Sequence, residues 1–547
     1  MTKKTRTFLF FILLFCFLVI APSIVFYSWG YRFNFETKKI VKTGAFYFKV
    51  LPKSAQIYLT PFDSKGLPAS ETKLLKRTDF FFGAILIENL LPKRYEIEIK
   101  KDGFYPWKKN LEIKENQVTE AKNIVLVPQD IGINPLIKNV EDFFPSPDEK
   151  IIILKETAES SGTSSPPGSN SAGWSLKTFE VQNNVKSQLM DSKNLSKDGQ
   201  VYLLDLKFSS DSERLLLKVD VGEEDSSSSS PFTAARVKQQ VKYYFLDLTQ
   251  ASPKAILLDF LTQALAKGED EATASSLNEE YQDISFHPNN SQKLIMLKSG
   301  AIFEADIAQK KISQKLLENV KSFQVFNQDF YYLDNSGFLF KTDFSFSSPE
   351  KINKQPFTRA VAKGEDENLS SSPSLEKDGS YQVDELRSSS PFANAWAIDV
   401  FLDWIFISDG QKIYFFNLES NSFEKFFETK KQLKISADSK KIAYASDYEI
   451  WILFLKPELG QPQKESKEQL FIARFSEKMG EIFFFTNHYL IFNSGGKIKI
   501  AETDDRDIIN IIDLAEFESP KIFWNQIYKK LFILSNGNFY SSKVLIP

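Results

Sequence analysis

A phrase of strand, tight polar turn and strand recurs through the C-terminal two thirds of this 547-residue chain. Recurrence at a near-fixed period indicates a repeat architecture, and it constrains the fold more than any other feature. The turn combines a Ser or His, a Pro or small residue, and an Asp or Asn whose side chain can bond its own backbone two residues on. β-forming residues flank the turn. The four clearest copies are 142–154, 206–217, 284–296 and 433–444.

Weaker copies complete the repeat, so that units begin near residues 142, 206, 284, 323, 397, 433, 482 and 522. These starts are about 40 residues apart wherever no low-complexity insert intervenes, which is the length of one propeller blade. The copies resemble the Ser-Pro-Asp-type repeats of Tol-B-like and WD-like bacterial propellers. That resemblance implies a closed ring of seven or eight blades in which the first and last units share a blade. A row of stacked sandwiches is the structural alternative.

The N-terminus carries an uncharged apolar run from Phe8 to Tyr31, preceded by basic residues. At about 1.5 Å rise per residue, a helix over this run spans a hydrocarbon layer of roughly 30 Å. We predict a cytoplasmic tail at 1–7 and a transmembrane signal anchor at 8–31. A signal peptide cleaved near Ala21-Pro22-Ser23 is the alternative. Because long domains translocate largely regardless of charge, we expect a single-pass protein of the cell membrane with its body extracytoplasmic.

Residues 44–128 alternate short apolar and polar runs, which predicts six strands in a small antiparallel sandwich. The expected strands are 45–50, 56–59, 85–87, 95–99, 111–113 and 124–126. Gly44-x-x-x-Phe48-x-Val50-x-Pro52, then Leu91-Pro92-x-x-Tyr95, then Gly103-Phe104-x-x-Trp107 resemble the PEGA domain of bacterial envelope and surface proteins. Lys53-Ser54 stand where the namesake Glu-Gly would be. The resemblance implies a non-catalytic β-module near the membrane or wall. An unrelated small sandwich is the alternative.

Four polar low-complexity tracts interrupt the propeller region at 130–547. They lie near 156–173, 222–236, 264–280 and 358–394. They cannot bury enough apolar surface to offset their ordering entropy, so we interpret them as disordered loops. One peptide, Ala-Lys-Gly-Glu-Asp-Glu, occurs in both the third and the fourth tract. We interpret it as a duplicated insertion, with a shared recognition peptide as the alternative.

Composition excludes several classes of function. A net charge of -3 and a pI near 5.9 give no basic footprint for nucleic acid. The single Cys16 excludes a disulfide within the chain and a thiolate metal site. His287 and His488, the two histidines, both stand in turns and are interpreted as structural.

No catalytic motif is present, and no catalytic, cofactor-binding or metal-binding residue is assigned. The acidic turn Asp504-Asp505-x-Asp507 is interpreted as solvated, with a cation site as the alternative. The tryptophans divide into two groups. Trp404, Trp451 and Trp524 lie within strands and are expected in blade cores, whereas Trp107 and Trp174 lie near turns and are candidates for stacking on a sugar ring.

Together these features predict an all-β protein with one N-terminal transmembrane helix, a PEGA-like sandwich and a seven- or eight-bladed propeller. The function expected is a membrane-anchored binding or scaffold protein of the bacterial cell envelope that is not an enzyme and needs no cofactor. Its expected partners are the cytoplasmic membrane, through Phe8–Tyr31, and an envelope protein or cell-wall glycan. A structural spacer without a specific ligand and a propeller-borne hydrolase or lyase are the alternatives.

Overall fold

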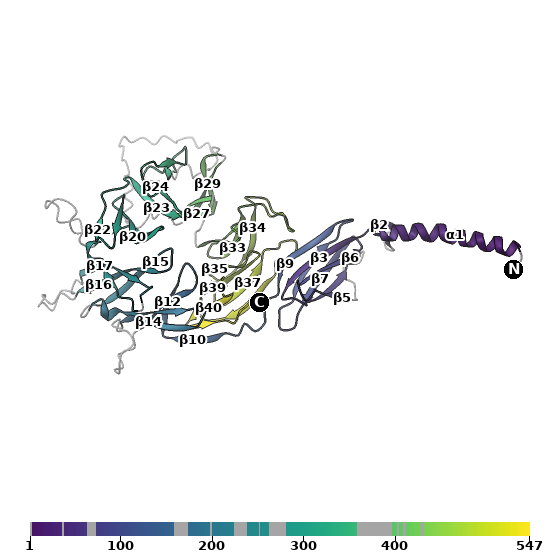
Figure 1. The fold of residues 1–547 in the computed structure, drawn as a ribbon, viewed down its shortest axis with the longest axis horizontal. Coiled ribbons are helices and arrows are strands. Elements are labelled where there is room, and N and C mark those ends of the chain that lie inside the picture. Colours follow the sequence, from purple (N-terminus) through teal and green to yellow (C-terminus); the bar gives the residue numbers. More distant parts are fainter. Residues whose placement is uncertain are drawn as a thin grey trace, which may run out of the picture. The chain divides into compact units, whose positions relative to one another are not determined.

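The computed structural model describes most of the chain, and strands make up most of its described elements (Figure 1). Described are 3–34, 38–62, 73–157, 173–196, 200–223, 238–250, 252–261, 281–357, 397–401, 404–408, 412–418, 420–427 and 432–546. Most of the four predicted low-complexity tracts, including both copies of the repeated peptide, lies outside these residues. The chain divides into two compact units: one holds 1–136, 434–444 and 448–547, and the other holds 137–433 and 445–447.

The first unit begins with a helix, α1 (Lys3–Ser28), that is long and apolar enough to cross a membrane over Thr5–Ser28 and buries none of that surface within the chain. It ends before the predicted boundary at Tyr31, because Gly30 adopts a positive φ of 82° and Tyr31 enters β1 (Tyr31–Asn34). β1 pairs with β2 (Lys39–Lys42). Arg32 of β1 also bonds α1, because its Nη1 donates to the Tyr27 carbonyl at 2.7 Å.

Two sheets form a sandwich after this hairpin (Figure 1). Their apolar faces share one core that includes Phe46, Phe48, Ile97 and Trp107. The three-stranded sheet has the order β6 (Ala84–Leu90), β3 (Gly44–Leu51), β9 (Val118–Val125). The four-stranded sheet has the order β5 (Lys73–Arg77), β4 (Gln56–Pro61), β7 (Arg94–Lys100), β8 (Trp107–Glu112).

The sandwich differs from the sequence prediction in two respects. It is not wholly antiparallel, because β3 and β9 pair in parallel, with Ala45 beside Val118 and Leu51 beside Val125. Alternation of apolar residues fixes which face of a strand is buried but not the direction of its neighbour. The strand β5 was not expected, since its sequence Lys-Leu-Leu-Lys-Arg does not alternate.

The second unit contains five four-stranded sheets, each with its strands in chain order. They are β11 (Val140–Pro145), β12 (Ile151–Thr157), β13 (Trp174–Glu180), β14 (Val185–Asp191); β15 (Val201–Phe208), β16 (Arg214–Glu223), β17 (Lys238–Asp247), β18 (Ile256–Leu257); β19 (Asp283–His287), β20 (Asn290–Lys298), β21 (Ala301–Asp306), β22 (Lys311–Ile312); β23 (Val320–Phe326), β24 (Asp329–Asp334), β25 (Leu339–Thr342), β26 (Glu350–Lys351); and β27 (Ala397–Phe401), β28 (Trp404–Ser408), β29 (Ile413–Asn417), β30 (Ser422–Phe427).

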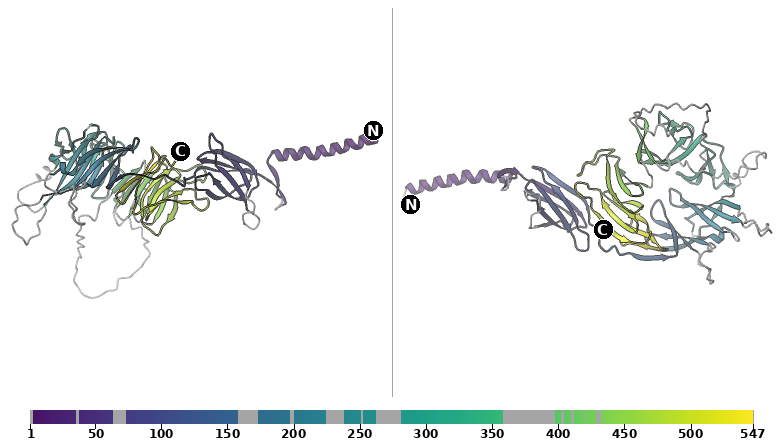
Figure 2. Two further views of the ribbon diagram at one scale, coloured as in Figure 1. Left: turned by 90° about the horizontal axis from the view of Figure 1, so that it is seen from below. Right: turned by 180° about the vertical axis from the view of Figure 1, so that it is seen from behind.

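Three further sheets of the same kind belong almost wholly to the first unit, and Figure 2 shows most of their strands, in green and yellow, from two other sides. They are β31 (Gln432–Ile435), β32 (Lys441–Ala445), β33 (Glu449–Phe454), β34 (Gln469–Arg474); β35 (Met479–Thr486), β36 (Tyr489–Ser494), β37 (Lys497–Glu502), β38 (Ile511–Glu516); and β10 (Asn134–Lys138), β41 (Asn538–Ser541), β40 (Lys530–Ser535), β39 (Lys521–Asn525). The last sheet joins the first strand of the repeat region to the last three.

These eight sheets are propeller blades of four strands each. Seven of the predicted starts fall in the first strand of a sheet, and the start near 522 falls in β39, the edge strand of the shared sheet opposite β10. The beginning and the end of the repeat region contribute to one blade, as predicted, because β10 shares a sheet with β39–β41.

The repeated polar turn has the expected mechanism. Ser146 Oγ donates to Asp148 Oδ1 at 2.7 Å and accepts from the Ile151 amide at 3.0 Å, so one hydroxyl ties the turn to the start of the next strand. Ser209 with Asp211 and Ser436 with Asp438 repeat this arrangement. His287 takes the place of the Ser in the remaining clear copy, where its Nδ1 accepts from the Asn289 amide at 3.2 Å. The structural interpretation of His287 agrees with this geometry.

Candidate functional site

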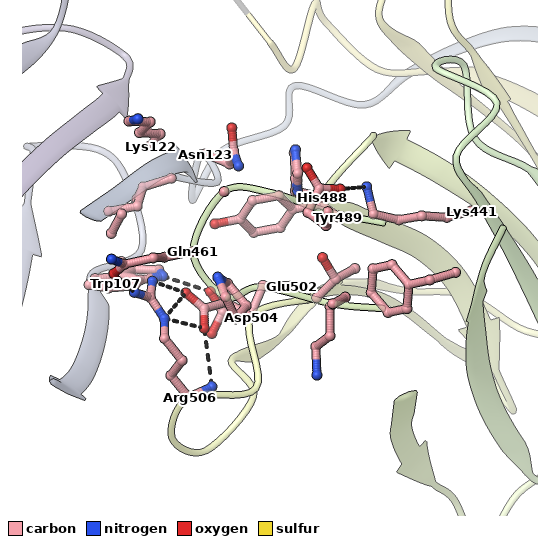
Figure 3. A pocket seen from close by; sticks show the side chains of 18 residues that line it. Trp107, Lys122, Asn123, Lys441, Gln461, His488, Tyr489, Glu502, Asp504 and Arg506 are labelled. Carbon is pink, nitrogen blue, oxygen red and sulfur yellow. Dashed lines mark hydrogen bonds and ion pairs between the residues drawn. The ribbon is translucent and has the colours of Figure 1, made fainter. Parts of the chain in front are cut away.

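The most concentrated set of buried charges in the described part of the first unit lies where the sandwich meets the blade of β35–β38 (Figure 3). We call this place the junction. It is formed by β8 and β9 of the sandwich, the loop between β33 and β34, and the segment 502–510 after β37. A cavity of about 50 Å³ remains among these side chains.

A buried ion pair is central to the junction. Lys109 of β8 places its Nζ 2.6 Å from Oε1 of Glu502, the last residue of β37, and the two side chains are 0% and 3% exposed. Trp107 adds a hydrogen bond from its indole Nε1 to the other Glu502 oxygen at 2.7 Å. Asn510 donates to Oε1 through its backbone and its side chain, at 3.0 and 2.7 Å. Burial raises the pKa of Glu502, and these donors oppose that rise.

A second carboxylate, Asp504, is clamped beside this pair. Arg506 donates to it from Nε at 3.0 Å and from Nη2 at 2.5 Å, a two-pronged contact visible in Figure 3. The same guanidinium donates from Nη1 to the carbonyl of Glu120 in β9 at 2.7 Å. Burial by itself would raise the pKa of Asp504, but Arg506 and Lys109 outweigh it and hold that pKa below its usual value.

Side chains from the blades also bond the outer backbone of the sandwich. Gln461 accepts from the Glu120 amide at 2.9 Å and donates to the Val118 carbonyl at 3.2 Å, as a neighbouring strand would. On β8, the Asn110 amide donates to Asp507 Oδ2 at 2.8 Å. Both β8 and β9 are outer strands of their sheets, so these contacts satisfy backbone groups that an open edge would expose.

The apolar core crosses the junction as well. Val125, the last residue of β9, and Val127 just after it belong to the same buried cluster as Ile500 and Trp524 of the last blades. Tyr489 lies at this boundary, where its hydroxyl accepts from the Val125 amide at 3.2 Å, and burial raises its pKa well above the usual value. The sandwich and the blades of the first unit are thus joined by a continuous core and a polar network.

His488 lies in the turn before Tyr489 and faces the same pocket. Burial, reinforced by the charge of Lys441, lowers its pKa to about 4, so the imidazole is neutral at pH 7. Its backbone is held on both sides: its amide donates to Thr486 Oγ1 at 3.1 Å, and its carbonyl accepts from the Thr503 amide at 3.0 Å. This geometry supports the structural interpretation of His488.

The junction contradicts the interpretation of the acidic turn as solvated. The turn Asp504-Asp505-x-Asp507 is not a solvated one: Asp504 pairs with Arg506, Asp505 Oδ2 accepts from Lys464 at 2.7 Å, and Asp507 bonds β8. Among the described residues, no cluster of three or more His, Cys, Asp or Glu is arranged to hold a metal ion.

Trp107 and Trp174 are not available to stack on a sugar ring, because both are only 4% exposed. The Trp107 indole bonds Glu502, and the Trp174 indole donates to the Val201 carbonyl at 2.8 Å. Each tryptophan begins a strand beside a turn, and neighbouring elements cover its ring. Of the tryptophans expected in blade cores, Trp524 is buried, whereas Trp404 and Trp451 are half-buried.

Sequence reasoning did not find Lys109, Glu502 or Arg506. Charged residues are common around Glu502 and Arg506, so no local signal marks these two. Lys109 does carry a signal, because it alternates with Trp107 and Leu111 on the buried face of β8. Since their charges are paired with one another, the chemistry that the arrangement supports is attachment of one module to the other.

No protein-family model matches the chain, and no curated protein matches it. Several solved propellers are similar to it at low identity. The C-terminal WD40 domain of Sif2 has a TM-score of 0.42 and 9% identity over 76% of this chain and 99% of that domain. BamB from Moraxella catarrhalis has a TM-score of 0.37 and 9% identity over 76% of this chain and 99% of its own. YCF48 from Cyanidioschyzon merolae has a TM-score of 0.33 and 10% identity over 63% and 96%. At these values the likenesses say nothing of what the chain binds.

Proposed function

We propose that this chain is a membrane-anchored binding or scaffold protein of the bacterial cell envelope, with its body outside the cytoplasmic membrane. In this proposal α1 anchors the chain, the sandwich is a PEGA-like module close to the membrane, and the propeller offers a loop-built face to an envelope protein or to cell-wall glycan. The chain acts by holding partners near the membrane rather than by catalysis.

The junction is the observation that carries this proposal. A flexible tether would need no buried contact between a membrane-proximal module and the blades that follow it. Here Lys109 and Glu502 pair with almost no solvent exposure, and Gln461 bonds the backbone of β9. Such an attachment fixes the last blades at a defined position on the sandwich, which suits a protein that presents a binding surface at a set distance from its anchor.

The side chains of the junction also favour binding over catalysis. A catalytic centre needs a nucleophile or general base with access to substrate. Glu502, Asp504 and Lys109 instead bond one another or neighbouring protein groups, and Cys16 lies in α1. The PEGA-like assignment is supported by the motif residues of the sandwich, several of which, including Phe48 and Trp107, are buried in its core.

Binding can be tested with the full chain reconstituted into lipid vesicles. Vesicles that carry the protein, vesicles without protein and vesicles with heat-unfolded protein are incubated separately with purified cell-wall glycan and with an envelope extract, then recovered by flotation. We expect glycan or a discrete envelope protein to float only with the folded chain. Absence of retention would favour a structural spacer, and release of glycan fragments would favour a hydrolase or lyase.

The direction of insertion is tested separately in intact cells that express the full chain. Protease added outside the cytoplasmic membrane should degrade the sandwich and propeller while leaving the short segment before α1 intact. Protection of the body until the membrane is permeabilised would place it in the cytoplasm and would overturn the envelope assignment.

A further inference from the structure

The loop between β5 and β6, residues 78–83, is a well-defined turn. The Asp79 carboxylate accepts from the Phe82 amide at 2.9 Å, and the Asp79 carbonyl accepts from the Gly83 amide at 3.0 Å. Gly83 has a positive φ of 66°, and a Cβ atom there would lie 2.4 Å from the Val50 carbonyl oxygen. Only glycine fits this position, and together with the Asp79 hydrogen bonds it defines the conformation of the loop.

This loop exposes three consecutive phenylalanines, Phe80, Phe81 and Phe82, at 73%, 72% and 74%. Outside α1, no other run of three large apolar residues is so exposed among the described residues. The rings of Phe80 and Phe81 pack edge to face, with their centroids 5.6 Å apart. Single exposed apolar residues are ordinary on protein surfaces, but a contiguous aromatic tip indicates a binding surface.

The loop lies on the free side of the sandwich. It joins β5 and β6, which are the outer strands of the two sheets opposite β8 and β9. The junction covers β8 and β9, whereas β5 and β6 have no further strand beside them in the described part of the chain. The blades of the first unit therefore leave the aromatic tip accessible.

Basic residues lie next to the loop in the sequence or in the strand register. Lys49 pairs across from Ala84, just after the loop, and Arg77 immediately precedes it. Lys53 approaches Gly83, and its carbonyl accepts from Lys101 Nζ at 2.6 Å. Together with Lys76 these residues make five basic groups near the loop, against two carboxylates, those of Asp79 and Asp102. The Asp79 carboxylate already accepts a hydrogen bond from the Phe82 amide within the turn. The charge around the rings is thus complementary to an anionic surface.

We propose that this aromatic tip enters the interfacial layer of the bilayer that α1 crosses, with the surrounding basic groups against anionic lipid head groups. The inference rests on the anchoring by α1 proposed above. Aromatic rings flanked by basic side chains are the chemistry by which protein segments bind anionic membrane surfaces. The anchor keeps the sandwich at high effective concentration near the lipid, so the tip needs only a weak affinity to stay bound. β6 runs from Ala84 beside Lys49 to Leu90 beside Gly44, so the loop lies at the end of the sandwich away from α1. The contact therefore requires the sandwich to lie lengthwise along the membrane.

The test uses the full chain in vesicles of equal parts phosphatidylcholine and phosphatidylglycerol. A C16S background carries one environment-sensitive fluorophore on a cysteine placed either by F81C or, as a matched control in an exposed propeller turn, by N183C. Nitroxide-labelled lipids report contact with the bilayer, and aqueous iodide reports exposure to water. Flotation of the same samples reports anchoring by α1 independently of the probe.

We expect lipid nitroxides to quench the probe at position 81 at least severalfold more than the probe at position 183. We also expect F80S/F82S to abolish this difference without changing the thermal transition, since both rings are exposed. High salt or vesicles of phosphatidylcholine alone should weaken the quenching.

If the chain floats but position 81 is as accessible to iodide as position 183, the loop inference is overturned while anchoring stands. If the chain does not float, anchoring fails and this inference fails with it. Protection of position 81 from both quenchers only after an envelope extract is added would overturn the lipid assignment in favour of a protein partner.

Discussion

Lys109 Nζ and Glu502 Oε1 lie 2.6 Å apart, although the first residue belongs to the sandwich near the N-terminus and the second to a propeller blade near the C-terminus. Neither side chain reaches solvent to any significant extent. A buried charge is costly unless it is paired, so each of these residues requires the other to stay where it is. This dependence makes the junction testable by single substitutions.

Lys109→Met should destabilise the first unit by about 3–5 kcal/mol, because it leaves the Glu502 carboxylate buried without its cation. Urea unfolding followed by tryptophan fluorescence measures this loss. Lys108→Met is the matched control: Lys108 is the preceding residue on β8, its side chain is 55% exposed, and its partner Glu98 keeps a second cation, Lys100, so we expect little change. Equal effects of the two substitutions would contradict the role of the buried pair.

The double variant Lys109→Met with Glu502→Leu should recover part of the stability lost in Lys109→Met, because it removes both buried charges together. Recovery should be incomplete, since the Trp107 indole and the Asn510 side chain lose the acceptor that Glu502 provides. A double variant less stable than Lys109→Met alone would show that the carboxylate matters for reasons other than its pairing with Lys109.

His488 predicts a specific pH dependence of stability. Its pKa falls from the usual 6.5 to about 4 in the folded protein, so the unfolded state binds the proton more readily. The contribution of His488 to the free energy of unfolding is therefore fully present above pH 6.5. It is lost as the pH falls towards 4, by roughly 3 kcal/mol in all. The free energy of unfolding measured across this window should decline less steeply in His488→Gln. As a control, His287→Gln should change the pH dependence of the free energy of unfolding less, because His287 is only half-buried. If wild type and His488→Gln show the same pH dependence, the lowered pKa assigned to His488 is wrong.

The Ser-Asp turn of the repeat can be tested at Ser436. Ser436→Ala removes the hydroxyl that bonds both Asp438 and the Lys441 amide, and it should cost about 1–3 kcal/mol because that amide is buried. The control lies in the same turn: Ser439 has a positive φ of 56°, so Ser439→Gly should be neutral or slightly stabilising. Thermal unfolding distinguishes the two. A neutral Ser436→Ala would mean that the hydroxyl does not define the turn.

The repeat was readable from sequence because each copy carries its own turn chemistry and flanking β-formers, so seven of the eight predicted starts fall in the first strand of a blade. The apolar helix was readable from its lack of charge. The direction of β9 was not, because nothing in its sequence distinguishes a parallel neighbour from an antiparallel one. The strand β5 lacks alternation altogether.

The junction escaped prediction for a different reason. Lys108 and Lys109 are adjacent and identical, yet only Lys109 shares the buried face of β8 with Trp107 and Leu111, and its partner Glu502 is remote in sequence. The turn Asp504-Asp505-x-Asp507 looked like an ordinary acidic turn, since the partners of Asp505 and Asp507, which are Lys464 and Arg94, lie on other elements. Pairing between remote charged residues leaves no periodic trace in a single sequence.

The central claim is that the last blades close the outer edges of the sandwich, and hydrogen exchange at two backbone amides tests it most directly. The Asn110 amide bonds Asp507 and the Glu120 amide bonds Gln461, so in the full chain both should exchange slowly, unlike the amide of Phe81 in the exposed loop. Asp507→Ala should release Asn110 alone, and Gln461→Ala should release Glu120 alone. If both amides exchange in the wild type as fast as that of Phe81, the edges are open and the junction does not hold the two modules together.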